Sequence, residues 1–572
     1  MTKPLIMLVL LCSLLAACST RTQEAAPAAP EAKQQPATAT ESAVRNQQKG
    51  DARHEGIAAT PSERKLLSAD YARREMTAPS VAMPAPISVP VIDETRENYA
   101  QLNDHPIKAV IEEPVSTFSI DVDTASYANV RRMLRSGQLP PHDAVRVEEL
   151  INYFPYEYPR RLSTHPFTVN TEIAPAPWGT NKQLIRIGIR AQELQQASLP
   201  PANLVFLVDV SGSMNSPDKL PLLKSSLKLL AERIRHQDRV SLVVYASGTG
   251  VVLEPTSNRE QVLRAIDQLR PGGSTAGEAG IRLAYRMARQ AFIQGGINRI
   301  LLATDGDFNV GISDIGQLKQ LVEREREAGI SLTTLGFGTG NYNDALMEQL
   351  ADIGNGNHHY IDSLNEGQKV LVEEMSSTLA TVAKDVKIQV EFNPQQVSEY
   401  RLIGYNNRML RREDFNNDKV DAGDAGAGQT VTAIYEVTFT GAAGYLEPLR
   451  YGNKKLGRST TIGEELAFLR LRYKEPDGTR SQLLEIPLRK ADARPSFSAA
   501  SNEFRFATAV ASFGELLRGG QFQQGMDFAR VGQIATAARG ADPFGYRAEF
   551  VQLARLAGQL LPGQATATYP ID

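Results

Sequence analysis

The middle of the chain alternates continuous apolar runs with amphipathic segments, and this alternation constrains the fold more than any other feature. The four apolar runs occupy residues 204–208, 240–245, 300–303 and 330–335. Between the first two, Leu220, Leu223 and Leu227 recur at the three- and four-residue steps of a helix. Apolar strands separated by helices predict a mostly parallel, doubly wound sheet that helices cover on both faces.

Short polar stretches follow two of these runs and one glycine-rich turn. Asp209, Ser211 and Ser213 follow the first run, Thr275 follows a Gly-Gly-Ser turn, and Asp305 follows the third run. Ligands of such folds bind outside the carboxyl ends of the strands, so we expect Asp209 and Asp305 on one rim. Two carboxylates and three hydroxyls, without sulfur or imidazole, are the ligands of a hard divalent cation. Mg²⁺ is the first choice, and Ca²⁺ and Mn²⁺ stay open.

Each stretch taken alone has an ordinary structural explanation. The residues from Asp209 to Ser213 would serve as the N-terminal cap of a helix that begins near Pro217. The Gly272-Gly273 pair and the Asp305-Gly306 pair would each serve as a turn. The three stretches in this order, each in its expected place, favour the metal site.

The same three stretches resemble the metal-ion-dependent adhesion site of von Willebrand factor type A domains. The resemblance covers about 180 residues in the middle of the chain. It implies that Ser211 and Ser213 bind a metal directly. It also implies that Asp209, Thr275 and Asp305 bind it directly or through water. Because such a site leaves the cation poorly neutralised, the resemblance implies that a carboxylate of another protein completes the coordination.

The segments that flank this block are rich in strands. Residues 167–173 and 183–190 precede it, and residues 386–392, 429–439 and 466–473 follow it. We predict that these strands form one β-sandwich into which the α/β domain is inserted. Residues 118–158 and the region after residue 385 also resemble the flanking segments of a bacterial lipoprotein group that carries an internal type A domain.

The N-terminus has the layout of a secretory signal. Lys3 precedes an apolar stretch over residues 5–15, and the sequence Leu-Ala-Ala-Cys that ends at Cys18 resembles a bacterial lipobox. The resemblance implies a lipid on Cys18, and Ser19 after it implies the outer rather than the inner membrane. A plain signal peptide with a chance cysteine is the alternative. No later segment reaches the roughly 18 apolar residues of a membrane-spanning helix.

The chain therefore divides, on our interpretation, into seven parts. Apolar residues at helical spacing near the end, such as Phe506, Val510 and Phe513, predict a helical C-terminal region. The parts are a lipoprotein signal peptide (1–18), a disordered tether rich in Ala, Pro and Gln (19–112), an N-terminal α/β segment (113–162), the first sandwich strands (163–198), the type A domain (199–382), the remaining sandwich strands (383–495) and the helical region (496–572).

The net charge and the absence of catalytic motifs reduce the number of functional classes that the sequence supports. A net charge of −3 offers no basic field for nucleic acid. The sequence lacks the HExxH, G-x-S-x-G and Walker A motifs, so we expect no enzyme. We predict a lipoprotein of the bacterial envelope that binds an acidic group of a partner protein through a divalent cation. Two alternatives stay open: a scaffold with metal-independent contacts, and a metal-assisted envelope hydrolase.

Overall fold

The computed structural model describes the chain from residue 97 to residue 561 with interruptions. The described ranges are 97–120, 123–160, 164–179, 181–195, 198–274, 277–306, 315–340, 342–374, 380–420, 422–447 and 464–561. The predictions for Cys18, for most of the tether and for Thr275 therefore fall outside the described residues. Within these ranges, no helix combines the length and the apolar character that crossing a bilayer requires.

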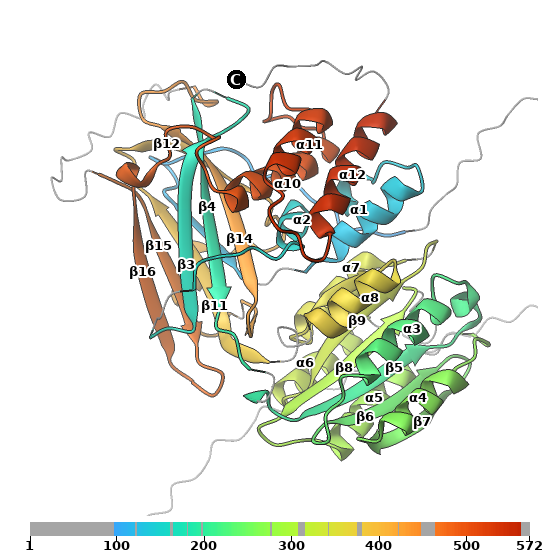
Figure 1. Cartoon of the computed structure of the whole chain (residues 1–572). Coiled ribbons are helices and arrows are strands. Elements are labelled where there is room, and N and C mark those ends of the chain that lie inside the picture. Colours follow the sequence, from blue (N-terminus) through green and yellow to red (C-terminus); the bar gives the residue numbers. More distant parts are fainter. Residues whose placement is uncertain are drawn as a thin grey trace, which may run out of the picture. The chain divides into compact units, whose positions relative to one another are not determined.

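The central α/β domain is built on a six-stranded sheet with the order β10-β9-β8-β5-β6-β7 (Figure 1). All its strands run parallel except β7, which lies antiparallel to β6. This confirms the predicted doubly wound, mostly parallel sheet. The strands are β5 (Ala202–Asp209), β6 (Arg239–Tyr245), β7 (Thr249–Thr256), β8 (Ile297–Thr304), β9 (Ser331–Phe337) and β10 (His358–Ile361).

Helices cover both faces of this sheet because its central strands β5, β8 and β9 are buried on both sides. One core contains Phe206 with buried residues of α3 (Leu220–Ala231) and α4 (Arg259–Gln268). The other contains Leu207 with buried residues of three helices on the opposite face. Those helices are α5 (Gly277–Gln290), α6 (Ile315–Glu327) and α7 (Asp344–Ile353). Alternate residues of β5 thus enter different cores, as the strand period requires.

The flanking strands form two antiparallel sheets that share one core, which confirms the predicted sandwich. Strand β4, which precedes the central domain, pairs with β14, which follows it. The first sheet contains β1 (Lys108–Ala109), β12 (Val397–Ile403), β14 (Thr430–Phe439), β4 (Lys182–Ala191) and β3 (Phe167–Pro175). The second contains β13 (Ala425–Gly426), β11 (Thr381–Phe392), β15 (Glu465–Lys474) and β16 (Ser481–Arg489), with β2 (Val115–Ser119) paired to β11.

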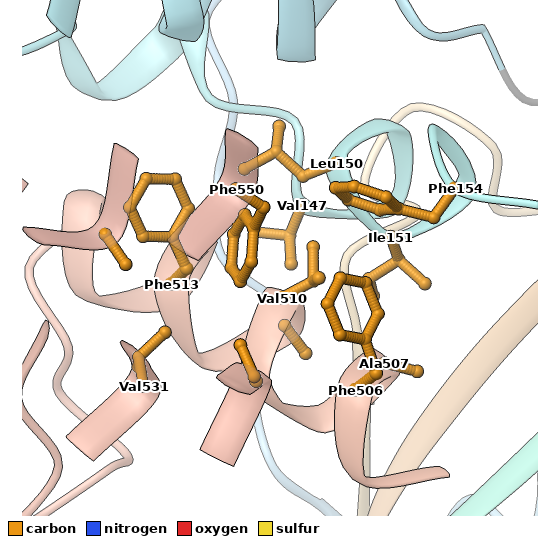
Figure 2. Close-up of a cluster of buried hydrophobic side chains, with 14 of the residues drawn as sticks. Val147, Leu150, Ile151, Phe154, Phe506, Ala507, Val510, Phe513, Val531 and Phe550 are labelled. Atoms are coloured by element: carbon orange, nitrogen blue, oxygen red, sulfur yellow. The ribbon is translucent and has the colours of Figure 1, made fainter. Parts of the chain in front are cut away.

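A fourth core joins helices from both ends of the described chain. The helices are α1 (Ala125–Arg135), α2 (Val147–Asn152), α10 (Asn502–Leu517), α11 (Phe528–Ala537) and α12 (Tyr546–Leu560). Figure 2 shows Phe154, which follows α2, among side chains of the C-terminal helices. Its ring lies edge-on to Phe506 with the ring centres 5.0 Å apart, and Phe513 meets Phe550 at 5.1 Å. The predicted N-terminal segment and the predicted helical region therefore share one core.

The predicted tether overlaps the described structure. Strand β1 lies before residue 112, the boundary that the composition suggested, and it pairs with β12. Farther upstream, the Asn98 N–H donates to the carbonyl of Tyr342 at 2.9 Å. A two-residue strand has too few side chains to give a periodic signal, so the sequence placed this boundary too late.

Candidate metal centre

Four of the five predicted ligands lie within the described residues, at the carboxyl ends of adjacent strands. Asp209 ends β5, and Asp305 follows directly after the neighbouring strand β8. Asp209, Ser211 and Asp305 are buried, whereas Ser213 is exposed. Asp209 and Asp305 therefore share one rim, as expected, and this rim combines two buried carboxylates with the exposed hydroxyl of Ser213.

Hydrogen bonds hold the Asp209 carboxylate in place. Its Oδ1 accepts the Ser211 N–H at 2.8 Å, and its Oδ2 accepts the Thr304 hydroxyl at 3.1 Å. The hydroxyls of Ser211 and Ser213 lie 3.0 Å apart. Two carboxylate oxygens and two hydroxyl oxygens are therefore positioned before any ligand arrives.

The glycine-rich turn docks against the same loop. The Gly212 N–H donates to the carbonyl of Gly273 at 3.0 Å, and the Gly272 N–H donates to the carbonyl of Val210 at 2.7 Å. At Gly273 a φ of +85° and the closeness of Ser247 leave no room for a side chain. All three predicted stretches thus meet at one place, although Thr275 itself is outside the described residues.

The charge at this rim fits a hard divalent cation. Burial raises the pKa of the Asp209 carboxyl to about 6, the charge of Asp305 adds to the rise, and hydrogen bonds from Ser211 oppose it. A raised carboxyl pKa means that the ionised form is poorly stabilised there. A cation bound by these carboxylate and hydroxyl oxygens would relieve that deficit, and the donor set is the one that Mg²⁺ and Ca²⁺ prefer.

Sequence reasoning missed Lys219 as a member of this site. Its Nζ lies 2.9 Å from Oδ2 of Asp305, and the two side chains are 12% and 2% exposed. Lysine is not a metal ligand in its charged form, so a search for oxygen ligands passes over it. Its position just before α3 was the only signal that the sequence carried.

A second buried acidic group lies between the central domain and its flanks. One carboxylate oxygen from each of Asp123, Glu149 and Glu348 falls within 4.8 Å of the others, a spacing that could hold a metal. Arg146 already pairs with Glu149, and Arg408 pairs with Asp123 at 2.8 Å and with Glu348 at 3.4 Å. Two guanidinium groups therefore supply the positive charge, and we interpret the group as an ion-pair network.

A cavity of about 1340 Å³ opens beside this network. Arg299 and His359 of the central sheet line one part of it, and Tyr153, Arg408 and Arg547 line others. The cavity lies near the amino-terminal end of β8, whereas the metal rim lies at the carboxyl end of that strand. The two features are therefore separate sites of one chain.

Three family models match the chain. The von Willebrand factor type A domain matches residues 203–377, a von Willebrand factor segment matches residues 93–186, and the model "Uncharacterized protein YfbK, C-terminal" matches residues 377–560. The type A match supports the fold given to the central domain, with the two antiparallel sheets and the helices outside it.

Comparison with curated proteins extends these matches over most of the chain. "Uncharacterized protein YfbK" of Escherichia coli (strain K12) is 49% identical over 469 residues, which is 80% of this chain and 80% of that protein. The inter-alpha-trypsin inhibitor heavy chain H3 of Mesocricetus auratus is 25% identical over 259 residues, which is 41% of this chain and 29% of that protein.

Solved structures are more distant. The von Willebrand factor type A protein of Catenulispora acidiphila covers 66% of this chain and 88% of its own, with 16% identity and a TM-score of 0.38. The pilus adhesin SpaC of Lactobacillus rhamnosus GG covers 57% of this chain and 48% of its own, with 13% identity and a TM-score of 0.27. The extent and identity of the Escherichia coli match settle the relationship: the chain belongs to the YfbK family and contains a von Willebrand factor type A domain.

Proposed function

We propose that this protein is a binding protein that recognises an acidic group of a partner protein through a divalent cation. One observation carries the proposal: two buried carboxylates and two serine hydroxyls converge on one rim of the type A sheet. The rim reaches the surface at Ser213, so a partner has access to it.

The number of ligands explains why a partner is needed. Asp209 and Asp305 supply the only formal negative charge among the four described ligands, and Lys219 already offsets part of it. Mg²⁺ requires six oxygens in an octahedron, so ligands beyond these four are needed. A carboxylate from another protein supplies both an oxygen and a negative charge, which makes it a better ligand than water.

Isothermal titration calorimetry of the full-length chain with Mg²⁺ tests the first step. We expect saturable binding that Asp209→Ala abolishes. The matched control is Asp267→Ala, which removes an exposed carboxylate of the same domain, and it is expected to bind like the parent chain. Absence of saturable binding of Mg²⁺, Ca²⁺ or Mn²⁺ by the intact chain overturns the proposal.

We also propose that the protein is a lipoprotein of the bacterial cell envelope, held at the outer membrane by a lipid on Cys18. The support is the lipobox-like sequence before Cys18 and the serine after it. Metabolic labelling with an alkyne fatty acid, followed by separation of the two membranes, tests this. Label should be lost in Cys18→Ser and retained in the matched control Cys12→Ser. Equal labelling of both variants contradicts the anchor.

The two alternative functions, a scaffold and a metal-assisted hydrolase, predict different experimental results. In pull-downs without crosslinking, a scaffold with metal-independent contacts keeps its partners in EDTA, whereas the proposed binding protein loses them. A metal-assisted hydrolase turns over envelope polymers or peptides in the presence of Mg²⁺, and Asp209→Ala stops it. We propose a non-catalytic role because the sequence pairs no nucleophile with a general base.

A further inference from the structure

We propose that Lys219 is an internal cation that competes with the divalent cation for Asp305 and thereby sets the metal affinity of the rim. The inference rests on the proposed metal binding and deepens it. Its first observation is the ion pair itself: the Lys219 Nζ lies 2.9 Å from Oδ2 of Asp305, and the pair is largely buried. A buried ion pair interacts more strongly than an exposed one, because water screens it less.

The backbone fixes where this lysine begins. The Lys219 N–H donates to the carbonyl of Ser216 at 3.1 Å, and its own carbonyl accepts the Leu223 N–H at 2.8 Å in the first turn of α3. Lys219 is thus the residue from which α3 starts. The backbone of Lys219 is therefore held in place, and only its side chain can move from Asp305 toward solvent.

The structure also leaves a path for the aliphatic part of the side chain. It runs against Gly338, where an added Cβ would lie 2.2 Å from Cε and 2.4 Å from Cγ of Lys219. Gly338 has a φ of +71°, a conformation that side chains rarely adopt. Any residue other than glycine here would both strain the backbone and push the lysine out of its place.

Competition follows from the charges. Without a metal, the ammonium group neutralises one of two neighbouring carboxylates. A divalent cation that binds Asp305 brings two further positive charges next to that ammonium, and like charges at this distance repel. Metal binding therefore has to displace the lysine toward solvent, and the energy needed for this lowers the affinity. A divalent cation would then occupy the rim only at concentrations high enough to displace Lys219 from Asp305.

Calorimetry of Lys219→Gln with Mg²⁺ tests the competition. Removing the ammonium should raise the Mg²⁺ affinity by at least about tenfold relative to the parent chain. Lys219→Arg keeps the charge and should stay near the parent value. Lys228→Gln removes an exposed ammonium from the same helix and serves as the matched control. Thermal unfolding of each variant verifies that it is folded.

The outcomes separate this inference from the proposed function. If neither the parent chain nor Lys219→Gln binds a divalent cation, the proposed function is wrong. If both bind with equal affinity, or the variant binds more weakly, metal binding stands and the competition is wrong. A second measurement needs no variant: amine acylation followed by mass spectrometry should modify Lys219 faster in Mg²⁺ than in EDTA. Unchanged or slower modification refutes the displacement.

An independent observation concerns the cavity of about 1340 Å³, where we infer a binding site for a small organic or inorganic anion. Arg299 at the start of β8 is 5% exposed, and its guanidinium donates to the Thr333 hydroxyl at 2.8 Å. Among the described residues no carboxylate lies within ion-pair distance of it, and its Nε has no hydrogen-bond partner. A buried guanidinium without an anion is costly, so this one favours an incoming anion.

The other buried cations of the cavity are already paired. Arg408 contacts Asp352 at 2.9 Å, and Arg547 contacts Glu503 at 2.7 Å. Arg299 therefore differs from them, and burial lowers its pKa to about 10 while Asp424 opposes the shift from a distance.

A second donor faces the same cavity. The strand register places Arg299, Thr333 and His359 on one face of the sheet. Burial lowers the pKa of His359 to about 3, so its ring is neutral, and its buried Nε2 has no partner among the described residues. With hydrogen on Nε2, the ring donates to the same ligand as Arg299. A carboxylate or a phosphate, with at least two acceptor oxygens, fits both donors.

Calorimetry with succinate and with inorganic phosphate, at matched ionic strength, distinguishes the two anions. We expect saturable binding of at least one, weakened at least about tenfold by Arg299→Met. Arg264→Met, an exposed position on α4, is the matched control. Because Arg299→Met removes a poorly paired buried charge, the variant should unfold at no lower urea concentration than the parent chain. Binding of neither anion, or equal binding by Arg299→Met, overturns the site.

Discussion

The Asp209→Asn substitution should stabilise the protein when no divalent cation is present. Asp209 is completely buried, and burial raises the pKa of its carboxyl from 3.8 to about 6. The folded state therefore binds this proton more tightly than the unfolded state does. The stability gained from that proton is fully present below about pH 4 and is lost as the pH rises through about 6. Asparagine removes the charge that opposes folding above this range.

The size of the effect follows from two opposing terms. A pKa shift of roughly two units corresponds to about 3 kcal/mol of unfolding free energy, since one unit is about 1.4 kcal/mol. The Oδ2 of Asp209 accepts the Thr304 hydroxyl, and an amide nitrogen at that place would lose this hydrogen bond. Such a loss costs about 1 kcal/mol. We therefore expect a net stabilisation of about 2 kcal/mol.

Urea unfolding in EDTA provides the assay. At about pH 8 Asp209→Asn should be more stable than the parent chain, and at about pH 4 the difference should vanish or reverse. In saturating Mg²⁺ the order should reverse, because only the parent chain gains stability from the bound ion. Asp305→Asn is the contrasting variant: it leaves Lys219 without its carboxylate and should destabilise the chain in EDTA. Asp209→Asn that is less stable than the parent in EDTA at about pH 8 would refute the reasoning.

Three further substitutions test the packing outside the metal rim. Arg146→Met leaves Asp344 buried without the guanidinium that lies 2.6 Å away. Urea unfolding should show that the free energy of unfolding falls by about 3–5 kcal/mol. A fall below about 1 kcal/mol would mean that the ion pair contributes little to stability. Phe513→Ala opens a cavity in the helical core and should cost about 3–5 kcal/mol in the same assay; a loss below about 1 kcal/mol would contradict the tight packing of that ring. Gly188→Ala places a Cβ 2.4 Å from the ring of Tyr158 and should lower the melting temperature, so an unchanged melting temperature would contradict the packing of that ring.

The buried ion pairs of two arginines between the domains could not be predicted from the sequence. Arg131 pairs with Glu366 at 2.8 Å and Arg146 pairs with Asp344 at 2.6 Å, and both arginines are buried. Arg131 lies in α1, an amphipathic helix, and Arg146 is the residue directly before α2, and charged residues at such positions ordinarily face water. The burial of each arginine depends on a carboxylate about 200 residues away, as in the separation of 198 between Arg146 and Asp344. Local periodicity carries no information about such a partner.

Lys219 illustrates the same limit within a single domain. The positions of Asp209, Ser211 and Asp305 followed from the pattern of strands and turns, because each stands directly after a strand or in the loop that follows it. The contact of Lys219 with Asp305 depends on how its side chain passes over Gly338, in the turn after β9. The spacing of residues along the chain does not predict this path.

The sequence by itself determined the classes of the elements and the rim that carries the candidate ligands. Apolar period and turn residues are local properties, and the carboxyl ends of parallel strands must share an edge. Only the tertiary structure decided which distant segments share a sheet or a core. It paired β4 with β14 across the central domain, joined α1 and α2 to the C-terminal helices, and placed an ammonium group on the rim. These choices depend on complementary shape and charge between surfaces that meet only after folding.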